Sequence, residues 1–266
     1  MKPFLHAAGL LFRAHLWRTL RARRSLVAAA LALLPVILAT IVSQVARFEG
    51  PAPIEVVFSI AWYFHVQTIV PLVALVLAGG VVAEEIEDRT ITYLFTRPIP
   101  RASILLGRWL AAAIPVVVLL GLSSAAVIAL LGRAGSAEHT AEWLPDGFRT
   151  RLVVTVMMGA AVYSAIFAAA GALLKHPILV GLAYTFVFEG FLGNLPGSNQ
   201  KATVIYYLKS FLFAKNPELT GDLREAFFTV SLASAGSAVR ALLLILVIGL
   251  ALGAWRFSRR EYVLAA

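Results

Sequence analysis

WLAAAIPVVVLLGLSSAAVIALL, residues 109–131, contains no charged side chain, and its only hydroxyl groups are those of two serines. A helix of this length extends about 34 Å, which is enough to cross a hydrocarbon core of roughly 30 Å. Further apolar runs of membrane-crossing length lie at about 26–46, 57–82, 152–174, 177–195 and 239–257. The sequence therefore predicts an all-α integral membrane protein with six transmembrane helices.

The composition agrees with this class of protein. The 266 residues are 60% hydrophobic and 14% charged, whereas a soluble domain carries about 25% charged residues. The chain contains no cysteine, which excludes disulfides and thiolate metal sites. The net charge of +9 lies largely beside the apolar runs, as expected for membrane topology signals. We expect no nucleic-acid partner, no metal and no cofactor in this chain.

The distribution of Lys and Arg predicts the orientation in the membrane. Six cations precede the first predicted span, and four more lie in 83–108, on the same side. The other side carries nine, of which five are spread over the long segment 196–240, where charge has less influence on topology. The pattern favours cytoplasmic termini, and an even number of spans places both termini together.

Residues 1–25 combine a cationic face with an apolar one. At 100° per residue, Phe4, Leu11 and Leu16 fall among the apolar positions. The opposite face carries Arg13, Arg18, Arg21 and Arg24. This pattern is typical of a helix at the headgroups of an anionic leaflet. The alternative is a basic tail that only sets orientation; we favour the helix.

The densest mixed charge lies in AEEIEDRTITYLFTRPIPRASILLGRW, residues 83–109, between the second and third predicted spans. Its acids stand in the first turns of a possible helix, where the helix dipole favours them, and Glu85 and Arg89 form a favourable i,i+4 pair. Pro98 ends that helix, because it cannot donate a backbone hydrogen bond. The segment is either a short amphipathic helix that transmits force from a cytoplasmic partner or a polar loop with self-paired charges.

A family resemblance rests on this segment. The matching residues are Glu85, Glu87, Thr90, Leu94, Pro98, Arg101, Gly107 and Arg108. The pattern resembles the cytoplasmic loop of ABC-2 type permeases, the membrane subunits of ATP-binding-cassette exporters, a group that includes the NosY-like proteins. The resemblance implies a coupling helix that docks on an ATPase subunit. The implied coupling residues are Glu84, Glu85, Glu87, Asp88, Arg89, Thr90, Leu94, Pro98 and Arg101.

The resemblance also implies the organisation of a single permease domain, residues 1–266. Its parts are an interfacial elbow helix 1–25, spans one and two in 26–82, a coupling loop 83–108, spans three to five in 109–195, extracytoplasmic helices 196–238, span six in 239–257 and a cytoplasmic tail 258–266. For 196–238 the residues themselves predict two short amphipathic helices, within TVIYYLKSFLFAK and LREAFFTVSLASAG, each too short or too interrupted to span.

The expected assembly contains two ATPase subunits and a second permease chain, most simply as a homodimer, in a bacterial inner membrane. An extracytoplasmic accessory protein is a further candidate partner. The sequence lacks a G-x-x-x-x-G-K-[ST] phosphate loop. We therefore expect no enzymatic activity in this chain, with ATP and Mg²⁺ bound by the separate ATPase subunit.

Two ionisable residues lie within predicted spans, and each has two interpretations. Glu189 and His65 are candidate translocation-path residues, because ionisable groups at membrane depth are often functional. The alternative for Glu189 is a side chain that reaches the membrane interface or forms a hydrogen bond with a neighbour. For His65 the alternative is a buried, hydrogen-bonded histidine, which is more common than a ligand or proton carrier.

The competing functions are a stand-alone secondary transporter or channel, an intramembrane enzyme and a non-transporting scaffold. Ion coupling usually needs several intramembrane ionisable groups, and H-E-x-x-H and G-x-S-x-G motifs are absent. The ABC permease is the favoured interpretation.

Overall fold

The structure is a computed structural model that describes residues 2–50, 54–80, 101–133, 147–174, 176–195, 197–213 and 231–259. In these ranges the chain forms helices and no strands. Six helices are long and apolar enough to cross a membrane. The predicted fold class, an all-helical membrane protein with six spans, is therefore confirmed.

Four of the spans are single α-helices: α2 (Arg23–Glu49), α7 (Arg101–Leu131), α9 (Phe148–Leu173) and α13 (Ala235–Arg259). The second span joins α3 (Ile54–Phe58), the π-helix η1 (Ser59–Ile69) and α4 (Val70–Ala78). The fifth span joins α10 (Pro177–Ala183), the π-helix η2 (Tyr184–Phe191) and the 3₁₀ turn η3 (Leu192–Asn194). The remaining helices are α1 (Lys2–Arg21), η4 (Ser198–Ala202) and α11 (Val204–Phe213).

The observed bounds differ from the predicted ones mainly at the third span. Helix α7 begins at Arg101, eight residues before the predicted apolar run, because Ser103, Ile104 and Leu105 are already buried within the bundle. In the outer segment, α11 corresponds to the first of the two predicted amphipathic helices. Most of the second lies outside the described residues.

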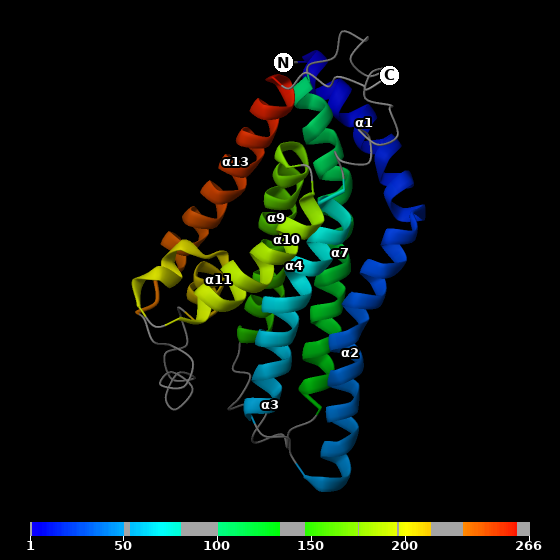
Figure 1. The fold of residues 1–266 in the computed structure, drawn as a ribbon. Coiled ribbons are helices and arrows are strands. Elements are labelled where there is room, and N and C mark those ends of the chain that lie inside the picture. The colour runs from blue at the N-terminus through cyan, green and yellow to red at the C-terminus, as the bar shows by residue number, and fades with distance from the viewer. Residues whose placement is uncertain are drawn as a thin grey trace.

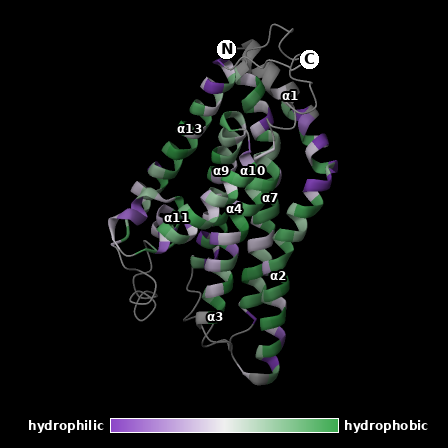
Figure 2. Ribbon diagram, viewed as in Figure 1, coloured by the Kyte–Doolittle hydropathy of each residue, from purple (hydrophilic) through white to green (hydrophobic). Residues whose placement is uncertain are grey.

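Several of the long helices begin or end at two opposite ends of the molecule. The start of α1, the start of α7 and the end of α13 lie at one end, and α3 and the end of α2 lie at the other (Figure 1). Hydrophobic residues dominate α2, α7 and α13 along their lengths, whereas hydrophilic residues mark α1 (Figure 2). This pattern is expected of helices surrounded by lipid, with polar groups at the membrane surfaces.

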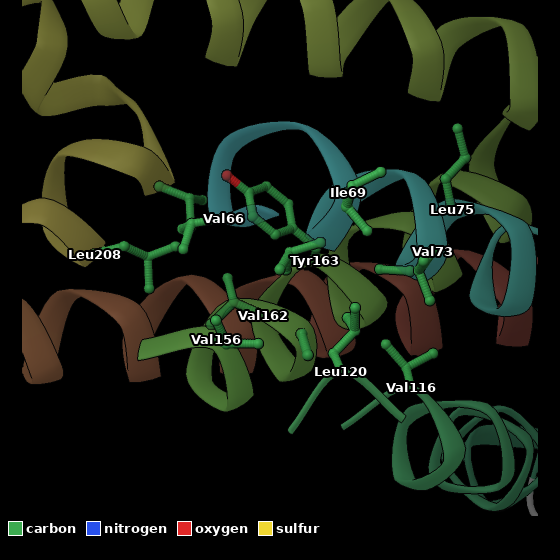
Figure 3. Close-up of a cluster of buried hydrophobic side chains, with 14 of the residues drawn as sticks. Val66, Ile69, Val73, Leu75, Val116, Leu120, Val156, Val162, Tyr163 and Leu208 are labelled. Carbon is green, nitrogen blue, oxygen red and sulfur yellow. The ribbon is translucent and has the colours of Figure 1, made fainter. Parts of the chain in front are cut away.

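The core of the bundle lies around α9 and the second span. Within their apolar windows 67% of the residues are buried, against 22% for α2 and 17% for α13. Figure 3 shows side chains from different helices meeting there, among them Val66 of η1, Leu120 of α7, Val156 of α9 and Leu208 of α11. The second and fourth spans are therefore interior, and the first and sixth are peripheral.

Small residues bring α9 and α13 into close contact. A Cβ atom at Gly253 of α13 would lie 3.1 Å from Ala169 Cα of α9, and one at Gly249 would lie 3.8 Å from the Ala165 carbonyl. This G-x-x-x-G pair of α13 therefore faces an A-x-x-x-A pair of α9, an arrangement that lets helix backbones approach closely in membranes. The small residues of 159–171 thus serve, at least in part, the interior of the bundle.

Candidate functional site

Most residues of the predicted coupling site lie outside the described part of the chain. These are Glu84, Glu85, Glu87, Asp88, Arg89, Thr90, Leu94 and Pro98. Of the remaining motif residues, Arg101 begins α7, and Gly107 and Arg108 lie two turns further along the same helix. The Arg108 side chain is only 1% exposed, so this cation of the motif lies within the bundle.

The elements that flank this segment do lie in the described structure. Helix α4 runs toward the end of the molecule where α7 begins and α13 finishes (Figure 1). The segment between α4 and α7 is thus attached to the second span on one side and to the third on the other. A force applied to it would act directly on these two spans.

Glu189 lies in η2 and is completely buried. Its Oε1 accepts hydrogen bonds from the Val204 N–H at 3.0 Å and from the Tyr184 hydroxyl at 2.5 Å. Its Oε2 accepts from the Ile205 N–H at 3.0 Å. The carboxyl group therefore satisfies the first two N–H groups of α11, which have no partner within that helix.

Thr203 completes this helix start, because its Oγ1 accepts from the Tyr206 N–H at 3.2 Å. A carboxyl group also lies favourably at the positive end of a helix dipole. The structure thus gives Glu189 a definite role, the cap of α11. Its predicted role in a translocation path stays a prediction.

His65 lies in η1 and is 1% exposed. Its Nε2 is 3.5 Å from Ser123 Oγ of α7, and that hydroxyl donates to the Ala32 carbonyl of α2 at 2.6 Å. Because the single hydroxyl hydrogen of Ser123 is given to Ala32, His65 Nε2–H is the donor to Ser123. The histidine therefore belongs to a hydrogen-bonded link among the first three spans; its role in translocation stays a prediction too.

Lys209 of α11 is a functional candidate that the sequence analysis did not single out. It is 2% exposed, and its Nζ lies 5.9 Å from the centroid of the Trp62 ring in η1, a cation–π distance. Burial lowers the pKa of Lys209 to about 8, because removal from water disfavours the charged form. The sequence feature that points to this residue is a lysine within the apolar stretch VIYYLKSFLF.

This burial predicts how stability depends on pH. In the unfolded chain Lys209 has its usual pKa of 10.5, so between pH 8 and 10.5 the unfolded state binds more protons than the folded state. Stability is therefore expected to rise across this window, by about 3 kcal/mol in total. Lys209→Met removes the titration and should flatten the rise, as measured by melting temperature from pH 7.5 to 10.5.

The control for this prediction is Lys201→Met, since Lys201 is exposed on η4. That variant should keep the rise. An equal rise in the Lys209→Met protein would contradict the assignment of the pH dependence to Lys209.

The predicted interface arginines lie on or next to α1. Arg13, Arg18 and Arg21 are exposed and Arg24 is half-buried. The Arg21 guanidinium stacks over the ring of Trp17 at 5.2 Å, and Trp17 is 59% exposed. At the end of α13, Arg259 stacks on Trp255 at 5.1 Å in the same way. Exposed Trp–Arg pairs are typical of the membrane–water interface.

The fold, the apolar helices and the polar ends together define a multi-pass helical membrane protein. A family model described as ABC-2 family transporter protein matches residues 18–262, which is nearly the whole chain. The chain therefore belongs to the ABC-2 transporter family, whose members are transmembrane permeases that work with an ABC ATPase and are not themselves catalytic. A search among curated proteins found no significant match.

Proposed function

We propose that this chain is the permease subunit of an ABC exporter, which couples ATP hydrolysis in a separate ATPase subunit to movement of a substrate across or out of the membrane. The observation that carries the proposal is the family match over residues 18–262. The loop residues quoted above, which resemble those of NosY-like permeases, support docking of the ATPase at the segment between α4 and α7. ATP and Mg²⁺ would be bound by that subunit.

The proposed assembly has two permease chains and two ATPase subunits in a bacterial inner membrane, with both termini cytoplasmic. We place the second permease chain against the fifth span, whose exposed face carries large aliphatic and aromatic side chains. Among them are Ile178, Leu179, Phe186, Val187 and Phe191. An accessory protein at the outer surface remains a further candidate partner.

We also propose that α1 lies at the cytoplasmic headgroups. Its exposed arginines suit anionic lipids, and the Trp17–Arg21 and Trp255–Arg259 pairs would lie at the same interface. Quenching of Trp17 by lipids brominated close to the headgroup measures this position; quenching only by lipids brominated at the chain ends would contradict it.

The competing secondary transporter receives less support from the structure. Glu189 and His65 both form hydrogen bonds within the chain, to a helix start and to Ser123 respectively. Groups held in this way are poorly suited to an ion relay, which requires repeated exchange of partners.

A charge reversal in the loop tests the proposed docking site. Glu87→Lys is expected to reduce recovery of the ATPase subunit with the tagged permease by tenfold or more, about 1.4 kcal/mol, because it places a cation at the proposed contact. The measurement is affinity purification in mild detergent with quantitative mass spectrometry. Arg47→Glu is the control, since Arg47 is exposed near the end of α2, at the opposite end of the molecule.

The control should recover as much ATPase subunit as the unsubstituted chain. Full recovery with Glu87→Lys would remove Glu87 from the docking site. A chain that never copurifies with an ATPase would contradict the proposed function itself.

A further inference from the structure

Helix α11 is a short helix at the side of the bundle, between its two ends (Figure 1). Its ten residues extend about 15 Å, half the thickness of a hydrocarbon core, so it cannot cross the membrane. Eight of its residues are nevertheless buried. The helix packs against α9 and α13, deep within the fold.

The start of α11 is attached to the fifth span. Glu189 of η2 accepts from the N–H groups of Val204 and Ile205 at 3.0 Å each. The same carboxyl group accepts from Tyr184 of its own span. The two bonds to α11 are buried, so breaking them without replacement would leave polar groups unpaired in an apolar interior.

The middle and end of α11 are attached to the second span. Lys209 lies over the ring of Trp62 at 5.9 Å. The ring of Phe213, the last residue of α11, lies 6.2 Å from that of Trp62 and 5.9 Å from that of Phe58. An ammonium group and an aromatic cluster therefore hold α11 against η1 and α3.

A third attachment joins α11 to the segment that leads into α13. The Tyr206 hydroxyl donates to the Ser231 carbonyl at 2.9 Å, and the Ala233 N–H donates to Ser210 Oγ at 3.1 Å. Polar side chains thus attach α11 to the fifth span, the second span and the segment that leads into α13, in addition to its packing against α9 and α13.

The two spans held by ionisable groups share an unusual backbone. The second contains the π-helix η1 and the fifth contains the π-helix η2, and these segments contact each other. π-Helical turns are rare and occur often at functional sites. The second span also leads, through α4, directly into the proposed docking segment.

We propose that α11 transmits movement from the second span to the fifth and sixth spans, with Lys209 and Glu189 as the positioning residues that hold it to the two π-helical segments. The inference rests on the proposed function, because the movement begins where the ATPase subunit docks. A buried ion or carboxyl group cannot leave its partners without a large desolvation cost. Helix α11 therefore follows the spans instead of sliding past them.

The absence of cysteine from the sequence makes a direct measurement practical. Spin labels are placed at Lys201→Cys on η4, directly before α11, and at Phe48→Cys on α2. Both sites are exposed, Phe48 by 88%, and α2 has none of the attachments to α11 described above. The distance between the labels is measured by pulsed electron resonance, in the complex with the ATPase subunit, with and without MgATP.

The expected result is an ATP-dependent shift of the distance distribution, which is lost in Lys209→Met and in Glu189→Gln while ATP hydrolysis continues. Lys209→Arg should keep the shift, because it preserves the cation over Trp62. Ser124→Ala is the matched control: this buried hydroxyl donates to the Gly121 carbonyl of its own helix, and its loss should leave the shift unchanged. Melting temperatures establish that each variant is folded.

Two results overturn the inference. One is a labelled parent complex that hydrolyses ATP without any shift, and the other is a shift of unchanged size in both Lys209→Met and Glu189→Gln. Failure of the proposed function gives a different result, since no ATPase subunit would then bind the labelled chain.

Discussion

Replacing Glu189 with alanine is expected to lower the free energy of unfolding by about 3 kcal/mol. The substitution leaves three donors without their acceptor, the buried N–H groups of Val204 and Ile205 and the half-buried hydroxyl of Tyr184. Each unpaired donor costs roughly 1 kcal/mol or more in an apolar interior. Thermal unfolding followed by tryptophan fluorescence in lipid nanodiscs measures the loss.

Two further variants show whether the loss comes from the cap. Glu189→Gln keeps one acceptor oxygen and should lose clearly less stability than the alanine variant. Asn194→Ala removes a hydrogen bond from the exposed Asn194 side chain to the Gly190 carbonyl, in the same part of the chain, and should change stability by about 0.5 kcal/mol at most. An alanine variant at position 189 as stable as the parent would show that α11 does not depend on this cap.

Replacing Gly253 with leucine is expected to cost a similar amount, about 3 kcal/mol, at the upper end of the range for overpacked sites. The first atom of the new side chain would lie 3.1 Å from the Ala169 Cα atom and 3.2 Å from Leu105 Cδ2. A backbone atom cannot move aside as a side chain can, so α13 must shift away from α9. The separation should appear as a lower melting temperature and as weaker protection of α9 and α13 amides from hydrogen exchange.

Gly249→Ala is the matched control in the same helix. Its added methyl group would lie 3.8 Å from the Ala165 carbonyl, an ordinary packing distance, and stability should stay within about 0.5 kcal/mol of the parent. Equal effects at positions 249 and 253 would contradict the close contact at Gly253.

The spans could be predicted from sequence because apolar length alone determines them. A run such as residues 109–131 is too apolar to stay in water. In lipid its backbone hydrogen bonds must be made within the segment, which an α-helix achieves. The start of α7 at Arg101 could not be predicted in this way. It depends on burial of Ser103 and Ile104 by neighbouring helices, which is a tertiary effect.

The roles of the buried ionisable residues could be predicted only in part. The sequence showed that Glu189 lies at membrane depth, but its partners are backbone groups 15 and 16 residues away, and no side-chain pattern identifies them. Lys209 was missed because a lone lysine in an apolar helix suggests a charge that reaches the surface. The coupling roles of residues 83–100 stay predictions, because these residues lie outside the described part of the chain.

The contact between α9 and α13 also bears on the order in which contacts form while the chain is synthesised. Ala169 and Gly253 touch although they are 84 residues apart in the chain, so at roughly 5–20 residues per second the ribosome needs about 4–17 s to supply the partner of α9. During that interval Ala165 and Ala169 of α9 face lipid or the insertion machinery. The α11 cap, in contrast, joins residues 15 apart and can form almost as soon as both have been made. The α11 cap therefore forms before α13 packs, and release of the nascent chain before α13 would leave the alanines of α9 exposed to quality-control proteases.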